Sequence, residues 1–167
     1  MPMTTGSSAR VSPVTRMAAD SPALALTVQY ASAREGLPRR AQLRQWARAA
    51  LVDEVAVVLR FVGEEEGRQL NREYRGKDYA TNVLTFAYGR EQPDAPLSGD
   101  IALCVPVVAA EAATQNKPLE AHYAHLVVHG MLHLQGYDHE EAGEAAVMEA
   151  VETFVMMRMG YPDPYQS

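Results

Sequence analysis

The chain has 167 residues, and 15 Lys and Arg against 21 Asp and Glu give it a net charge of −6 at neutral pH. This length suits one domain whose core is large enough to fold without disulfides. The single cysteine, Cys104, excludes a disulfide framework and a zinc site built from cysteines, and it indicates a reducing, cytoplasmic location. No apolar run approaches the roughly 20 residues of a membrane-spanning helix, so we expect no membrane partner.

The charge is unevenly distributed along the chain. Residues 34–77 carry ten basic and seven acidic residues, whereas residues 78–167 carry three basic and thirteen acidic residues. The acidic total argues against nonspecific coating of nucleic acid, which needs a positive surface, and we expect no DNA partner. The basic segment is either a solvated helix face or a surface that contacts RNA. If it contacts RNA, we expect the contact to be confined to a cleft lined by residues 34–77.

Residues 1–21 are rich in Ser, Thr, Pro, Gly and Ala and show no apolar periodicity, which predicts a disordered N-terminal extension. Arg10 and Arg16 against one acid leave an organellar transit peptide as the alternative. Residues 22–167 are predicted to form the folded domain. Alternating or β-branched apolar residues within it predict strands over residues 24–30, 55–62, 82–86 and 99–104.

Helical periodicity and helix-ending residues predict five helices in the same domain. They begin at Pro38, at Glu64, at Pro106, at Pro118 and near Glu140, and the last ends near Met159. We expect this last helix to have Val147, Val151, Phe154 and Val155 on one face. Four strands and five helices predict an α+β domain with a small mixed four-stranded sheet, on which the last helices pack.

All five histidines lie between residues 122 and 139, four of them on one predicted helix that is apolar almost all round. Such a helix is buried on most sides, and buried imidazoles need partners. His129 and His133 point from one helix face about 6 Å apart along the axis, which suits two ligands of one metal ion. Gly136 can reverse the chain so that His139 reaches the same ion. This spacing predicts a three-histidine zinc site with an open coordination position, as in catalytic sites.

Two further histidines, His122 and His125, precede the predicted ligands on the same helix. His125 and His133 are about 12 Å apart along the axis, too far to bind one zinc ion together. We interpret His122 and His125 as packing groups or as groups that orient the ligands, with substrate contact as the alternative. A core cluster without any metal is the competing hypothesis, and the triple spacing with its glycine disfavours it.

The spacing also matches the zincin protease pattern H-E-x-x-H-x-x-G-x-x-H, with one departure. Gly130 stands where the pattern has the glutamate that removes a proton from water. Without this carboxylate, ordinary peptide hydrolysis is disfavoured. The site therefore needs another base, such as Asp138 or the hydroxide itself.

The run His129 to His139, HGMLHLQGYDH, resembles the signature of the YbeY family of metal-dependent endoribonucleases. RGKDYATNVLTF at residues 75–86, LSGDI at 97–101 and GYPDPY at 160–165 resemble other parts of the family pattern. The resemblance implies a zincin-like fold and one zinc ion per chain, held by His129, His133 and His139. It also implies that Arg75 and His129 are catalytic. Lys77, in the same block as Arg75, is a weaker candidate for substrate contact.

The resemblance further implies a single-strand-specific endoribonuclease of ribosome biogenesis and ribosome quality control. Its substrate would be the 3′ end of small-subunit ribosomal RNA, and its partners would be the small ribosomal subunit and its proteins. Two alternatives stay open. One is a zinc hydrolase of a peptide or small molecule, and the other is a ribosome-assembly factor that does not cleave RNA. The alternative for Arg75 is a surface ion pair with Asp78 or Glu73.

Overall fold

The structure is a computed structural model of the chain, and it describes residues 22–33, 35–138 and 141–166. The predicted extension, residues 1–21, and the third predicted ligand, His139, lie outside the described residues. The described elements, in chain order, are β1 (Leu24–Tyr30), α2 (Arg40–Ala49), β2 (Val55–Val62), α3 (Glu64–Arg75), β3 (Val83–Gly89), β4 (Leu97–Cys104), α4 (Val105–Gln115), α5 (Leu119–Leu134) and α6 (Ala142–Arg158).

The four strands form one mixed sheet in the order β1-β2-β4-β3. β1, β2 and β4 run parallel to one another, and β3 pairs with β4 in the antiparallel direction at the edge of the sheet. Together with the five helices of the described residues, this sheet confirms the predicted α+β class. β3 and β4 extend beyond the predicted strands because their hairpin continues to Gly89 and from Leu97.

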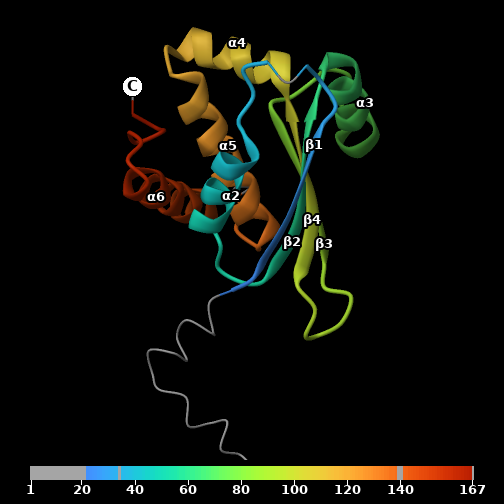
Figure 1. Cartoon of the computed structure of the whole chain (residues 1–167), viewed down its shortest axis with the longest axis vertical. Coiled ribbons are helices and arrows are strands. Elements are labelled where there is room, and N and C mark those ends of the chain that lie inside the picture. The colour runs from blue at the N-terminus through green and yellow to red at the C-terminus, as the bar shows by residue number, and fades with distance from the viewer. Residues whose placement is uncertain (1–21, 34, 139–140, 167) are drawn as a thin grey trace, which may run out of the picture.

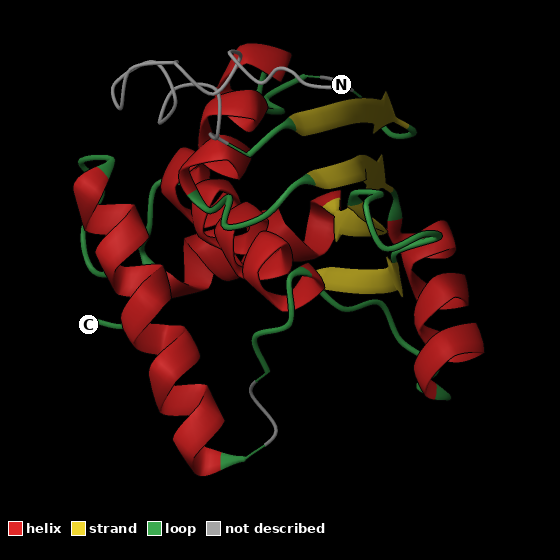
Figure 2. Cartoon of the chain, turned by 90° about the horizontal axis from the view of Figure 1, so that it is seen from below, coloured by secondary structure: helices red, strands yellow, loops and turns green. Residues whose placement is uncertain are grey.

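Helices cover both faces of the sheet (Figures 1 and 2). α2 and α5 lie on one face over the main hydrophobic core, and α3 lies on the other face. A smaller core of Leu84, Phe86 and Ala102, with Leu70 against it, lies on the α3 side. The prediction that the last helices pack on the sheet is confirmed for α5. It is wrong for α6, which packs mainly on α5, on the side away from the sheet.

The basic segment 34–77 supplies α2 and α3, which lie on opposite faces of the sheet. The prediction of one cleft lined by this segment is therefore wrong, because the sheet separates the basic residues of the two helices. Within the described residues, no helix is long and apolar enough to cross a membrane.

The buried face of α6 also differs from the prediction. Val147 is 56% exposed and Phe154 is 63% exposed. The buried positions follow an i, i+4, i+7, i+8 pattern; they are Met148, Glu152, Val155 and Met156. The helix is thus rotated so that an acidic side chain, Glu152, faces α5.

The C-terminal end of α5 is fixed by Gln135, which follows its last residue. The side-chain oxygen of Gln135 accepts hydrogen bonds from the backbone N–H groups of Val52 and Asp53, at 2.7 and 2.9 Å. Its amide nitrogen donates to the carbonyl oxygens of Ala50 and Met131, each at 2.9 Å. These bonds hold the end of α5 against the loop after α2, so the turn that carries His133 has a fixed position.

The contact between α5 and the sheet requires a glycine at position 99 of β4. A Cβ atom there would lie 2.5 Å from Cδ1 of Leu134 and 2.6 Å from the backbone oxygen of Phe86. We expect Gly99→Ala to lower the free energy of unfolding by about 1–3 kcal/mol, because backbone must move to relieve the contact. Urea unfolding measures this change.

Gly143→Ala is the matched control, since a Cβ at Gly143 meets nothing within 4 Å. Alanine also favours helix, so this variant should unfold at the same or a higher urea concentration than the unchanged chain. Equal midpoints for Gly99→Ala and the unchanged chain would contradict the packing argument.

Candidate metal centre

Three of the five histidines, His125, His129 and His133, follow one another at single-turn intervals along α5. The helix backbone is buried between α2, α4, α6 and the sheet, yet all three imidazoles stay partly accessible. The side chain of His129 is 23% exposed and that of His125 is 13% exposed. α5 is therefore a rigid support that presents these rings at the rim of the core.

Glu152 of α6 is the centre of the hydrogen bonding around these rings. Its carboxylate accepts from Nε2 of His125 at 2.6 Å and from Nδ1 of His129 at 2.8 Å. The hydroxyl of Tyr165 donates to the same carboxylate. Burial alone would raise the pKa of Glu152, but the hydrogen bonds from His125, His129 and Tyr165 outweigh it and lower the pKa to about 2. Glu152 is therefore an ionised acceptor for three donors, although its side chain is fully buried.

His133 is oriented by the chain turn that follows α5. Its Nδ1 lies 3.0 Å from the carbonyl oxygen of Tyr137, which can only accept, so Nδ1 carries the proton. Gly136, with φ of 110°, lies in the left-handed region and turns the chain so that this carbonyl faces back to the ring. The predicted role of Gly136 as a helix-ending turn is thus confirmed.

The two Nδ1 hydrogen bonds are the test of whether these residues fit a metal ion. With the protons of His129 and His133 on Nδ1, the lone pair of each neutral ring is on Nε2, which is the usual ligand atom. Metal-bound imidazoles are typically held in this way, by a carboxylate or a backbone carbonyl on the other nitrogen. The donor set of α5 therefore fits a zinc ion. Among the described residues no group of three potential ligands converges, and the third predicted ligand is His139.

His125 uses the other ring nitrogen. Because its Nε2 donates to Glu152, its hydrogen bonding differs from that of His129 and His133. This contact supports the interpretation of His125 as a group that orients its neighbours. His122, one turn earlier, is bound instead to Glu111 of α4, at 2.9 Å.

The residue next to His129 faces the sheet. A Cβ atom at Gly130 would lie 2.9 Å from Cδ1 and 3.1 Å from Cγ2 of Ile101 in β4. A glutamate at this position would point into the core, so the position that supplies the base in zincin proteases cannot do so on this backbone.

The weaker predicted residues lie in three different places. Asp138 directly follows Tyr137 and lines a cavity of about 470 Å³ beside the end of α5. Arg75 is the last residue of α3, on the sheet face opposite α5, and Lys77 is exposed just after it. The structure thus brings Asp138 near His133 along the chain, whereas Arg75 and Lys77 lie apart from the α5 histidines.

The ion pairs described for α3 do not include Arg75. Asp78 binds Arg68 at 2.8 and 3.0 Å and lies 3.6 Å from Arg72. Within the described residues, Arg75 makes no ion pair, so the alternative of a surface pair with Asp78 or Glu73 is wrong. Arg75 is exposed. The residue before it, Tyr74, packs on Phe86 of the edge strand β3, with ring centres 3.9 Å apart.

Sequence reasoning missed two residues of this centre, Glu152 and Tyr165. The available signal for Glu152 was an acid at an apolar position of α6, four residues after Met148 and four before Met156. Burial, and next the carboxylate of Glu152, raise the pKa of Tyr165, which keeps its hydroxyl protonated as a donor. Tyr165 is the last residue of the GYPDPY block, and nothing in that block by itself indicates a contact with Glu152.

The fold is shared with a solved protein. The solution structure of TM1509 from Thermotoga maritima matches with a TM-score of 0.50 at 25% sequence identity, over 85% of this chain and 99% of that one. The fold and the site therefore define a class of protein. It is an α+β domain in which a buried helix carries two imidazoles, each held through its Nδ1 atom.

The sequence comparisons identify the family within this class. The family described as "Endoribonuclease YbeY" matches residues 32–160. The endoribonuclease YbeY of Methylobacillus flagellatus is 61% identical over 146 residues, covering 87% of this chain and 96% of that protein. That of Cupriavidus necator is 58% identical over 151 residues, covering 89% of this chain and 76% of that protein. The chain belongs to the YbeY family of metal-dependent endoribonucleases, which confirms the family prediction made from the histidine run.

Replacement of Glu152 by glutamine should weaken metal binding while keeping the shape of the side chain. The amide can accept from one imidazole, but its NH₂ group then faces the other N–H donor. We expect zinc affinity to fall by about 10- to 100-fold, as for other changes to groups that hold metal-bound histidines. Competition with a chromogenic chelator measures the zinc dissociation constant.

The matched control is Glu149→Gln, an exposed position on the same helix. It removes the same charge and should leave zinc affinity unchanged. His129→Ala should lose zinc. If it does and the zinc dissociation constant of Glu152→Gln is unchanged, Glu152 does not orient the ligand.

Proposed function

We propose that this chain is a cytoplasmic, zinc-dependent endoribonuclease that cleaves single-stranded RNA and matures the 3′ end of small-subunit ribosomal RNA. Its further partners are the small ribosomal subunit and its proteins, in ribosome biogenesis and quality control, and residues 22–167 are its catalytic domain. One observation carries the proposal: α5 presents two imidazoles whose Nδ1 atoms are held by Glu152 and by the Tyr137 carbonyl. The membership in the endoribonuclease YbeY family supports RNA as the substrate.

His129, His133 and His139 would hold one zinc ion per chain. When bound, zinc supplies a Lewis acid for a phosphate oxygen and a water molecule of lowered pKa. The contribution of α5 and α6 is to fix the direction of two ligands before the ion arrives, because Glu152 and Tyr137 already hold their rings. Asp138, the residue directly before His139, is the proposed acceptor of the water proton.

Arg75 is the proposed partner of the scissile phosphate. A guanidinium is always charged and grips phosphate through two N–H groups, which suits the negative charge that develops during phosphodiester cleavage. Arg75 and α5 lie on opposite faces of the sheet, with the edge strand β3 between them. An RNA strand that follows the outer edge of β3 would meet both, and Lys77 would contact the same backbone.

The position of Gly130 disfavours the peptide-hydrolase alternative. A base at this position would point at Ile101 and away from the imidazoles, so a protease mechanism of the zincin type is not available. The assembly-factor alternative shares the same RNA contacts and differs only in the absence of cleavage. Variants that remain folded therefore decide between them.

His129→Ala and Arg75→Ala should each lower the rate of RNA cleavage by at least about 100-fold, since one removes a ligand and the other a phosphate contact. The measurement is cleavage of an unstructured RNA by proteins with unchanged circular dichroism, with casein as the comparison substrate. Arg158→Ala, which removes an exposed charge from α6, should cleave RNA as the unchanged chain does. Undiminished cleavage by both site variants, or cleavage of casein alone, would overturn the proposal.

Metal analysis tests the zinc assignment separately. Freshly purified protein should contain about one zinc ion per chain, and His133→Ala should contain far less. Treatment with a chelator should abolish RNA cleavage and lower the thermal unfolding temperature, because binding to the folded state alone stabilises it. Protein that cleaves RNA without any bound metal would contradict the assignment.

A further inference from the structure

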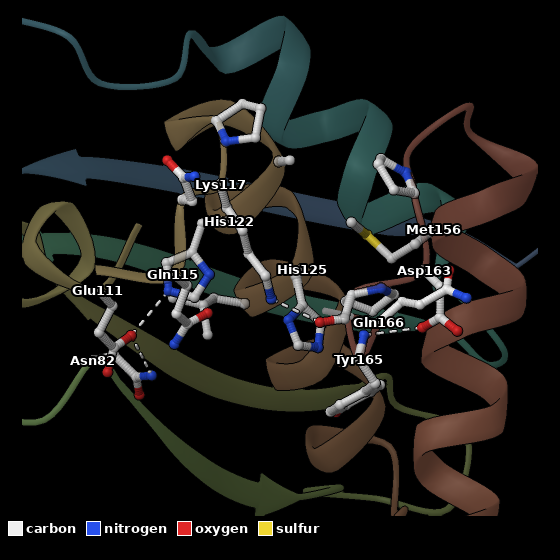
Figure 3. Close-up of a pocket in the computed structure, with 16 residues that line it drawn as sticks. Asn82, Glu111, Gln115, Lys117, His122, His125, Met156, Asp163, Tyr165 and Gln166 are labelled. Carbon is white, nitrogen blue, oxygen red and sulfur yellow. Dashed lines mark hydrogen bonds and ion pairs between the residues drawn. The ribbon is translucent and has the colours of Figure 1, made fainter. Parts of the chain in front are cut away.

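A cavity of about 830 Å³ lies at the first turns of α5, and Figure 3 shows the residues that line it. It is bordered by the end of α4, the first turns of α5 and the C-terminal residues 162–166. His125 forms part of its wall and shares the Glu152 carboxylate with His129. Because His125 and His129 are about 6 Å apart along the helix, whatever binds in the cavity is next to the proposed cleavage site.

One wall of the cavity is a fixed hydrogen-bonding surface. Oε1 of Glu111 accepts from Nδ2 of Asn82 and from Nε2 of His122, each at 2.9 Å (Figure 3). His122 is only 4% exposed, so it holds the carboxylate of Glu111 from the buried side of this wall. Neither hydrogen bond uses Oε2 of Glu111, whose side chain is 33% exposed. Because Glu111 is a lining residue of the cavity, its carboxylate can accept a hydrogen bond from a ligand with N–H donors.

The charges of the cavity argue against a phosphate as its occupant. Glu111 and Asp163 are acidic lining residues, and Lys117 is a basic one. Nζ of Lys117 donates to the carbonyl oxygen of Pro164 at 2.7 Å, which holds the C-terminal segment in place. The two carboxylates would repel a phosphate there, whereas they would not repel an uncharged polar ring.

The other side of the cavity carries an aromatic ring. Tyr165 stands edge-on to His125, with ring centres 5.2 Å apart, and 46% of the residue is exposed. Its hydroxyl is held by Glu152, so the orientation of the ring is fixed. Exposed, oriented aromatic rings are the stacking surfaces that bind single-stranded bases.

We propose that this cavity binds one unpaired base of the RNA substrate, adjacent to the cleaved phosphate, and that guanine fits it best. Guanine carries N1–H and N2–H donors on its Watson–Crick edge, which suit the carboxylate of Glu111. Enzymes that bind extruded bases combine such edge contacts with stacking, here on Tyr165. This inference rests on the proposed endoribonuclease activity and adds a base preference to it.

The test uses zinc-loaded full-length protein and oligouridine that carries a single guanosine at a different position in each substrate. Cleavage by the unchanged chain should occur at a fixed distance from the guanosine. Ala121→Phe fills the cavity from α5 without removing a polar group. The variant should have a KM about tenfold higher for these substrates, and its cleavage position should no longer depend on the guanosine. Ala113→Phe, exposed on α4 and outside the cavity lining, is the matched control and should behave as the unchanged chain.

Glu111→Gln provides a second, milder variant. Glutamine can keep the contacts with Asn82 and His122, but it replaces a charged acceptor by a neutral one. The preference for the guanosine-containing substrate over oligouridine should fall about tenfold, as expected for the loss of one charge-assisted hydrogen bond. Glu91→Gln, an exposed change in the β3–β4 loop, should leave this preference unchanged.

The outcomes separate this inference from the activity on which it rests. The base site is wrong if the unchanged chain cleaves RNA without regard to the guanosine. It is also wrong if Ala121→Phe and Glu111→Gln keep the same guanosine preference as the unchanged chain. Both outcomes leave the endoribonuclease activity in place. Failure of the unchanged chain to cleave any RNA overturns both. If Ala121→Phe does not fold, the guanosine preference of Glu111→Gln decides the question.

Discussion

The centre of this molecule depends on one buried carboxylate. Glu152 joins α6 to α5 through His125 and His129, and it joins the C-terminal segment to both through Tyr165. A buried charge is stable only with enough donors, and three donors surround this one. The same hydrogen bonds orient His129, close one side of the 830 Å³ cavity and hold the ring of Tyr165. The contacts that attach α6 and the C-terminal segment to α5 are therefore also the contacts that assemble the site.

Close packing of α5 on the sheet is the second constraint. Gly99 and Gly130 lack side chains where the helix and β4 approach each other, against Leu134 and Ile101. The approach places the histidine column at the rim of the core beside the edge strand. It also excludes a carboxylate at position 130, so the packing that positions the imidazoles is incompatible with the zincin protease base. The lack of space for a side chain at position 130 thus allows the close packing of α5 and also excludes one class of reaction.

The sheet separates the molecule into two chemical regions. The histidines, Glu152 and the cavity lie on the α5 side, whereas Arg75 ends a helix on the opposite face. The edge strand β3 lies between the two regions. A single extended strand of RNA can follow such an edge, while a rigid duplex is poorly suited to reach both faces and a deep cavity. The arrangement supports the proposal of an unpaired substrate, whose bases can be drawn out individually.

The sequence by itself determined the strands, the helices, the pair His129 and His133 and the turn at Gly136, because each depends on local periodicity or backbone conformation. It also determined the family, since the histidine run and its flanking blocks are specific. Only the tertiary structure decided that α2 and α3 lie on opposite faces, that α6 turns Glu152 inward and that Tyr165 reaches the same carboxylate. These contacts join residues far apart in the chain, and periodicity within one helix does not specify which neighbour a polar side chain will meet. An acid in an apolar stripe signals a buried partner, but the identity of that partner is fixed only by packing.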